Sequence, residues 1–149
     1  MSDGLPPPEP AGCATVVLDT NIVLDLWVFA DTASVSLREA ITARRLHWIG
    51  TASMREELQR VLGYPQIVSR LLARQLQADE VLACLDRHVQ TVADAPRADV
   101  RCRDPDDQKF VDLALRHRAL LLSKDALVLA LRKRMRLRGA DVMRSWPAP

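Results

Sequence analysis

Cysteine, histidine, aromatic residues and long apolar runs are scarce in this chain of 149 residues, and each scarcity excludes a class of protein. Its three cysteines and three histidines lack metal-ligand spacing, which argues against a disulfide scaffold or zinc site and favours a reducing cytoplasm. Because no apolar run approaches the ~20 residues of a membrane span and no signal peptide is recognisable, we expect no membrane association. Neither a P-loop nor a GxGxxG motif occurs, which disfavours a nucleotide-binding site.

The composition is that of a single globular domain, with 48% hydrophobic and 27% charged residues. Four prolines among residues 6–10 predict a disordered, proline-rich tail over residues 1–14, followed by one domain over residues 15–146. The charge is uneven: residues 116–149 hold nine Lys or Arg and two acids, whereas residues 1–115 hold 12 and 17. A basic C-terminal part favours a polyanionic partner.

Short apolar runs alternate with helical patterns along the chain. The apolar runs predict strands over residues 15–18, 46–49, 88–92, 119–122 and 141–143. The helical patterns predict helices over residues 21–30, 34–45, 53–62, 66–75, 78–87, 105–118 and 125–138. Alternating strands and helices are typical of an α/β fold, so we expect a three-layer α/β/α sandwich with a mainly parallel five-stranded sheet.

Four carboxylates stand where the expected strands end or helices begin: Asp19, Glu57, Asp107 and Asp125. Asp19 directly follows the first strand, and Asp125 follows the fourth after two intervening residues. Glu57 and Asp107 lie on the apolar faces of their expected helices, where an unpaired charge costs several kcal/mol. A charged partner or a bound cation would offset that cost for each of these two acids.

Each acid also has a simpler, structural explanation. Asp19 and Asp125 are suited to cap helix N-termini, and Asp107 in a first helical turn would favour the helix dipole. Glu57 would be satisfied by a partner arginine or by reaching the rim of the domain. We assign Asp104, which precedes a proline, mainly to helix capping, with a lesser role in the site.

Together, the four acids indicate a cation site. The carboxyl ends of parallel strands share one edge of the sheet, where ligands bind in α/β proteins. Four unpaired carboxylates at that edge would repel one another strongly, so a cation should hold them. Because the set contains no cysteine or histidine, its hard oxygen ligands favour Mg²⁺ or Mn²⁺ over zinc.

A basic segment, residues 132–138, carries five cations in seven positions. Apolar side chains recur there every four residues, so one helix face should pack inward and leave Arg132, Lys133 and Arg136 exposed. That exposed side is a candidate for salt-dependent contacts with RNA phosphates. Cations near a helix C-terminus also favour the helix dipole, so a purely structural role stays open.

Four short motifs, in order and at suitable spacing, resemble those of the PIN-domain family over about residues 15–145. They are VLDTNI at residues 17–22, SMREEL at residues 53–58, CRDPDDQKF at residues 102–110 and LSKD at residues 122–125. The third motif resembles that of one PIN subgroup whose members are proposed toxins of toxin–antitoxin pairs. The resemblance implies a sheet ordered 3-2-1-4-5 between helices and divalent-metal-dependent cleavage of RNA. It also implies that Asp19, Glu57, Asp107 and Asp125 are the catalytic, metal-binding acids.

The supporting positions of the motifs match in part. By the resemblance, Asn21 would orient Asp19, and the Ser123 hydroxyl would support the metal shell. The fourth motif departs from the family pattern, which often has Gly and a second Asp where this chain has Lys124 and Leu127. Loss of that acid bears on a second metal site, and Lys124 becomes a candidate for contact with phosphate or a solvated side chain.

The sequence thus predicts a cytoplasmic Mg²⁺- or Mn²⁺-dependent endoribonuclease, the toxin of a toxin–antitoxin pair. Its expected partners are an RNA substrate, a cognate antitoxin and a second copy of the chain. Two alternatives stay open: a non-catalytic RNA- or partner-binding module, and a metal-dependent phosphatase on a similar sheet. Against the phosphatase, residues 19–21 read Asp-Thr-Asn and so lack the second acid of an Asp-x-Asp nucleophile motif.

Overall fold

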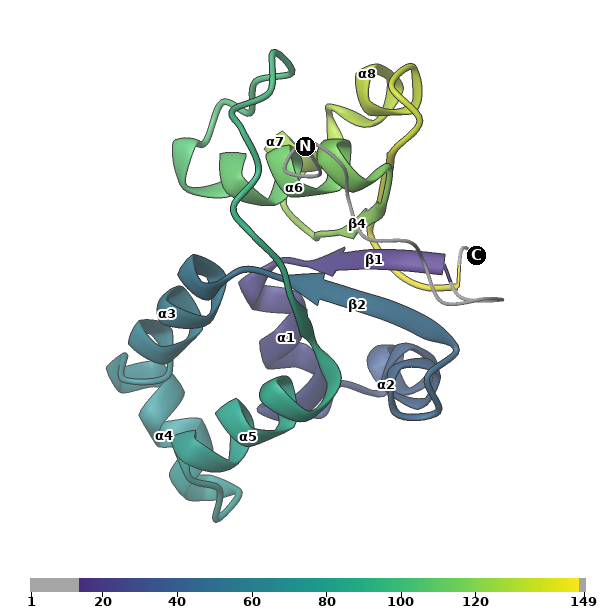
Figure 1. The fold of residues 1–149 in the computed structure, drawn as a ribbon. Helices are drawn as coiled ribbons and strands as arrows, with labels where there is room; N and C mark the ends of the chain where they lie inside the picture. Colours follow the sequence, from purple (N-terminus) through teal and green to yellow (C-terminus); the bar gives the residue numbers. More distant parts are fainter. Residues whose placement is uncertain (1–13, 148–149) are drawn as a thin grey trace.

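A computed structural model describes residues 14–147, which form a five-stranded parallel sheet between two layers of helices (Figure 1). The strands are β1 (Ala14–Leu18), β2 (Leu46–Gly50), β3 (Gln90–Thr91), β4 (Leu120–Leu122) and β5 (Asp141–Met143). They lie in the order β3-β2-β1-β4-β5 with every neighbouring pair parallel, which confirms the expected fold and strand order. Of the expected tail over residues 1–14, only Ala14 is within the described residues, and it is the first residue of β1.

Eight α-helices and two short 3₁₀ turns connect the strands within residues 14–147. They are α1 (Thr20–Trp27), η1 (Thr32–Ser34), α2 (Val35–Thr42), α3 (Ala52–Val61), α4 (Pro65–Ala73), α5 (Ala78–His88), η2 (Pro105–Asp107), α6 (Gln108–His117), α7 (Ala126–Leu129) and α8 (Arg132–Arg136). The helix expected over residues 125–138 is two helices, because the Leu131 N–H bonds the Val128 carbonyl at 3.0 Å and tightens the turn there. None of these helices is long and apolar enough to cross a membrane.

Alternate residues of the sheet face two separate hydrophobic cores. Val16 and Leu18 of β1 are buried with side chains of α1–α5, on the lower side of the sheet in Figure 1. Val17 points the other way and is buried with Phe110 of α6 and Met135 of α8. Burial on both faces explains why β1 is a continuous apolar run rather than an alternating one.

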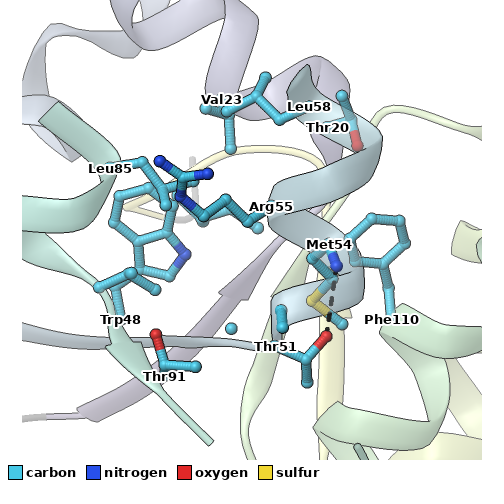
Figure 2. Close-up of a pocket in the computed structure, with 14 residues that line it drawn as sticks. Thr20, Val23, Trp48, Thr51, Met54, Arg55, Leu58, Leu85, Thr91 and Phe110 are labelled. Carbon is cyan, nitrogen blue, oxygen red and sulfur yellow. Dashed lines mark hydrogen bonds between the residues drawn. The ribbon is translucent and has the colours of Figure 1, made fainter. Parts of the chain in front are cut away.

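The helix α3 is placed by a cap at the end of β2. The Met54 N–H donates to the Thr51 side-chain oxygen at 3.3 Å, which fixes where the helix begins (Figure 2). Beside this cap lies an apolar cavity of about 110 Å³, lined by Trp48, Leu58 and other apolar side chains. The cap also sets the position of Glu57, which lies further along the same helix.

Candidate active site

The carboxylates of Asp104, Asp107 and Asp125 meet at the carboxyl edge of the sheet. One oxygen from each side chain lies within 4.8 Å of those of the other two. Asp104 caps η2 and Asp107 ends it, whereas Asp125 caps α7 just after β4. Within residues 14–147, none of the three forms an ion pair with Lys or Arg. The cluster therefore holds negative charge that neighbouring side chains do not neutralise.

Proton binding at Asp107 reflects this crowding. Burial, together with the charges of Asp104, Asp125 and Asp19, raises the pKa of Asp107 from 3.8 to about 7. When Asp107 holds its proton, it hydrogen-bonds Asp125. Near neutral pH, a proton thus offsets part of the repulsion, and a bound cation would favour the charged carboxylates in its place.

Asp19 is buried beside this cluster and is held by two hydrogen bonds. The Ile22 N–H donates to Asp19 Oδ1 at 3.0 Å, and the Ser123 side chain bonds the same carboxylate. Burial raises the pKa of Asp19, and the bond from Ser123 opposes that rise. Ser123 is fully buried, and its oxygen also accepts the Asp125 N–H at 3.1 Å. One hydroxyl thus joins the acids that follow β1 and β4.

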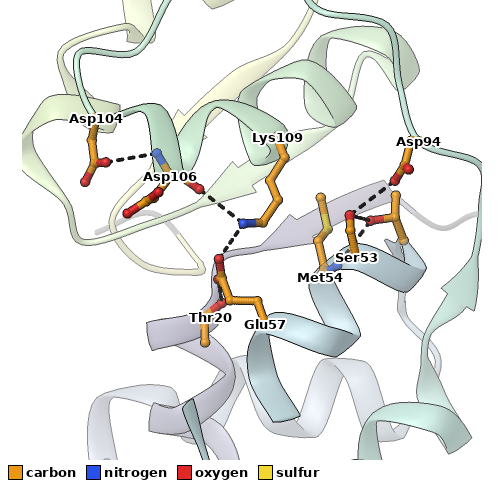
Figure 3. Close-up of polar contacts among 9 residues, drawn as sticks. Thr20, Ser53, Met54, Glu57, Asp94, Asp104, Asp106 and Lys109 are labelled. Carbon is orange, nitrogen blue, oxygen red and sulfur yellow. Dashed lines mark hydrogen bonds and ion pairs between the residues drawn. The ribbon is translucent and has the colours of Figure 1, made fainter. Parts of the chain in front are cut away.

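Asp19, Asp107 and Asp125 line a cavity of about 340 Å³, which Glu57 lines from α3. Two side chains hold Glu57 there: Lys109 forms an ion pair with Oε1, and the Thr20 hydroxyl donates to Oε2 (Figure 3). All four acids implicated by the sequence pattern therefore lie at one site. Glu57, however, already has a cationic partner, and the close three-carboxylate cluster contains Asp104 in its place.

The segment that carries this site matches a known family. The family model of the PIN domain matches residues 15–126, which is most of the chain. This chain belongs to the PIN-domain family. PIN domains are generally metal-dependent nucleases, so membership indicates a nuclease-type function. A comparison with curated proteins finds no match.

Two further residues of the PIN motifs lie differently from their expected roles. Asn21 is exposed on the cavity wall, and the bonds that hold Asp19 come from Ile22 and Ser123 instead. Lys124 pairs with Asp25, a carboxylate of α1 whose side chain is 8% exposed. The Lys124 charge still reaches Asp19, where it lowers the pKa of that carboxyl group.

The basic helix α8 lies beyond the residues that match the PIN family. Arg132 pairs with Asp141 at 3.0 Å, so part of its charge is offset. Arg132, Lys133, Arg136 and the exposed Leu137 line a shallow hollow of about 450 Å³. In the described part of the chain, Lys133 and Arg136 have no acidic partner within ion-pair distance, so both are available to a polyanion.

Sequence reasoning missed Lys109 and Thr20 as members of the site. The signal for a partner was present, because Glu57 falls on the expected apolar face of its helix, where a charge needs a partner. No local pattern, however, points to a contact between residues that are 52 positions apart, as Lys109 and Glu57 are. Thr20 follows Asp19 directly, but only the packing of α1 against α3 brings its hydroxyl to Glu57.

Proposed function

We propose that this PIN domain is an endoribonuclease that depends on Mg²⁺ or Mn²⁺. The observation that carries the proposal is the cluster of Asp104, Asp107 and Asp125, in which burial and like charges raise the pKa of Asp107 to about 7. Sites where carboxylates are forced together in this way are candidates for catalysis. Asp19 lies against the same cluster and belongs to the proposed site.

The donor set fits a hard divalent ion. It consists of carboxylate oxygens, without cysteine or histidine, and such ligands suit Mg²⁺ and Mn²⁺ better than zinc. Among residues 14–147, the three carboxylates have no Lys or Arg within ion-pair distance, so an ion would offset charge that those side chains leave uncompensated. The neighbouring cavity of about 340 Å³ leaves space for a phosphate group beside them.

The protein groups around the cluster have distinct parts in this proposal. Asp104, Asp107 and Asp125 would hold the ion, and Ser123 bonds both the Asp19 carboxylate and the Asp125 N–H. When bound, a divalent ion lowers the pKa of water and stabilises negative charge on a phosphate. In this proposal, Lys and Arg side chains position the phosphodiester of the substrate. No side chain of the protein acts as the nucleophile.

An RNA substrate is favoured by the charges of α8. Lys133 and Arg136 are exposed near one another, and phosphate contacts by such cations supply much of the affinity for nucleic acid. We propose that Arg132 joins them, with weaker effect because it also pairs with Asp141. Lys124 takes part only if its ion pair with Asp25 opens.

We further propose that the chain is a toxin with a cognate antitoxin, and that it forms a homodimer. The toxin role rests on the third motif, which resembles that of a subgroup of proposed toxins. An exposed apolar stripe along α4, formed by Tyr64, Val68 and Leu72, supports a protein partner.

Growth arrest on expression, relieved by Asp107→Asn, would support the toxin role. A change in mass on light scattering for Leu72→Glu would support the dimer, and a monomeric wild-type protein would exclude it.

A cleavage assay tests the nuclease proposal. Labelled single-stranded RNA and DNA of equal sequence are incubated with the full chain and Mn²⁺ or Mg²⁺, with and without EDTA. We expect cleavage of the RNA that EDTA abolishes, and a loss of about 100-fold or more in Asp107→Asn and Asp125→Asn. Asp79→Asn, at an exposed position of α5, is the matched control and should cleave as the wild type does.

Other outcomes of this assay identify other functions. Equal cleavage of DNA would overturn the preference for RNA but leave a nuclease. Salt-sensitive binding of RNA without cleavage would indicate a non-catalytic binding module. Release of phosphate from a small phosphate ester without cleavage of RNA would indicate a phosphatase.

A further inference from the structure

Lys109 lines the acidic cavity with its positively charged side chain. Its side chain is 31% exposed, and it pairs with Glu57, which is 18% exposed (Figure 3). Lys109 has two more anchors that do not depend on Glu57. The Asp106 carbonyl accepts a hydrogen bond from Nζ at 3.2 Å, and Nζ lies 5.2 Å from the centre of the Phe110 ring. The position of this charge is therefore set by three neighbours.

One N–H group of the Lys109 ammonium has no acceptor among the described residues. An ammonium group carries three N–H donors, and within residues 14–147 two of them have acceptors, on Glu57 and Asp106. The group lines the same cavity as Asp19, Asp107 and Asp125, so its remaining donor can reach a ligand bound there. A phosphate oxygen is the acceptor that suits an ammonium group in such a place.

Glu57, in turn, has no oxygen without a partner. Lys109 engages Oε1 and Thr20 engages Oε2. Glu57 is also absent from the cluster of three carboxylates whose oxygens lie within 4.8 Å of one another. Each oxygen of Glu57 keeps a second lone pair, so its two bonds do not by themselves prevent metal binding. They hold the carboxylate on Lys109 and Thr20, outside the group of three aspartates that an ion could bridge.

We propose that Lys109 serves as the second cation of this site: it neutralises Glu57, which holds no metal ion, and it binds a phosphate oxygen of the substrate. The site then takes one divalent ion per chain, at the three aspartates. This inference rests on the proposed nuclease function. It adds the number of divalent ions bound per chain and the residue that binds the substrate phosphate.

Titration calorimetry with Mn²⁺ alone tests the first part. The double variant Glu57→Gln/Lys109→Met removes the ion pair without changing the net charge. We expect wild type and double variant both to bind one Mn²⁺, with affinities within about threefold of each other. A loss of about tenfold or more in the double variant would make Glu57 a ligand and overturn the proposal.

The matched control removes another ion pair, also without changing the net charge. Arg55→Met/Asp86→Asn breaks the pair between α3 and α5, whose two residues do not line the acidic cavity, and should bind Mn²⁺ as the wild type does. In the single variant Lys109→Met, Glu57 loses its cation, and we expect a second Mn²⁺ to bind. Lys109→Met that binds one ion with unchanged affinity would also overturn the proposal.

Binding of RNA in EDTA tests the phosphate contact independently of any metal. Anisotropy of a labelled single-stranded RNA is measured over a range of salt concentrations. For Lys109→Met, we expect the slope of log K against log salt to fall by about 0.7, the value for one phosphate contact on a single strand, and Lys109→Arg should restore it. An unchanged slope would overturn the phosphate contact.

The outcomes separate this proposal from the proposed function. A wild-type protein that binds no Mn²⁺ and cleaves no RNA overturns the function, and the single-ion proposal with it. If the wild type binds Mn²⁺ and cleaves RNA but the double variant no longer binds Mn²⁺, only the proposed role of Lys109 is overturned. Melting by circular dichroism shows that each variant is folded before it is titrated, and the charge-balanced pair and Lys109→Arg provide independent tests.

Discussion

The carboxyl group of Asp107 lies against that of Asp125, and the two hydrogen-bond when Asp107 holds its proton. The pKa of Asp107 is raised to about 7 by burial and by the acids around it. A proton and a divalent cation therefore compete for one group of oxygens near neutral pH. This competition has consequences for binding and for stability that can be measured separately.

The affinity for Mn²⁺ should rise with pH up to about 7 and then level off. Below the pKa of Asp107, a proton must leave before the ion binds, so affinity should gain up to about tenfold per pH unit. Calorimetry from pH 5.5 to 8.5, in buffers of different ionisation enthalpy, measures both affinity and released protons. An affinity that is flat from pH 5.5 to 7 would contradict the raised pKa.

Without metal, the same group should make the protein less stable as pH rises. The folded pKa of Asp107 lies above its ordinary value of 3.8, so between about pH 4 and 7 the folded state binds more protons than the unfolded state. The free energy of unfolding should therefore fall as pH rises through this window.

Asp107→Asn should reduce this dependence on pH, and the raised pKa of Asp19 leaves part of it in place. The side chain forms no capping hydrogen bond at the start of α6, so the substitution loses no such bond. In EDTA at pH 8, we expect the variant to gain on the order of 1 kcal/mol, a figure reduced for solvent screening of this partly exposed group. At pH 4 the two proteins should differ little. Urea unfolding at both pH values measures this, and equal stability at pH 8 would argue against repulsion in the cluster.

Ser123 should matter for both stability and metal binding. Ser123→Ala removes the only side-chain bond to Asp19 within the described part of the chain and leaves the Asp125 N–H without its acceptor. We expect a loss of about 1–3 kcal/mol in the free energy of unfolding and about tenfold in Mn²⁺ affinity. The pKa of Asp19 should rise further, because the bond from Ser123 now lowers it. Ser69→Ala, at an exposed position of α4, is the control.

The sheet could be predicted from the sequence because each strand is marked by a local run of apolar residues. The apolar runs that became β1, β2 and β4 are buried on both faces, so their pattern alone predicts parallel strands. The edge strand β3 is the exception, since the run over residues 88–92 contains only two strand residues. His88 ends α5 instead, where its Nδ1 lies 2.8 Å from the Cys84 carbonyl oxygen.

The candidate site could be predicted from the sequence only in part, because some of its residues have two roles. The sequence before Pro105 marks Asp104 as a helix cap, and its Oδ1 does accept the Asp106 N–H at 3.0 Å. That local signal hides the second role, since the same carboxylate also joins the cluster with Asp107 and Asp125. Which acids come closest depends on how η2 lies against the start of α7, where Asp125 is the cap, and no pattern along the chain encodes that distance.

The basic helix should contribute to RNA binding through individual phosphate contacts. Lys133→Gln and Arg136→Gln each remove one exposed cation of α8, so each should lower the slope of log K against log salt by about 0.7 for single-stranded RNA. Arg132→Gln should have a smaller effect, because Arg132 is shared with Asp141. Arg38→Gln, on the exposed side of α2, changes the net charge equally and is the control. If all four variants shift the slope alike, the charges of α8 act only through the net charge of the protein, and the helix is not the RNA-binding surface.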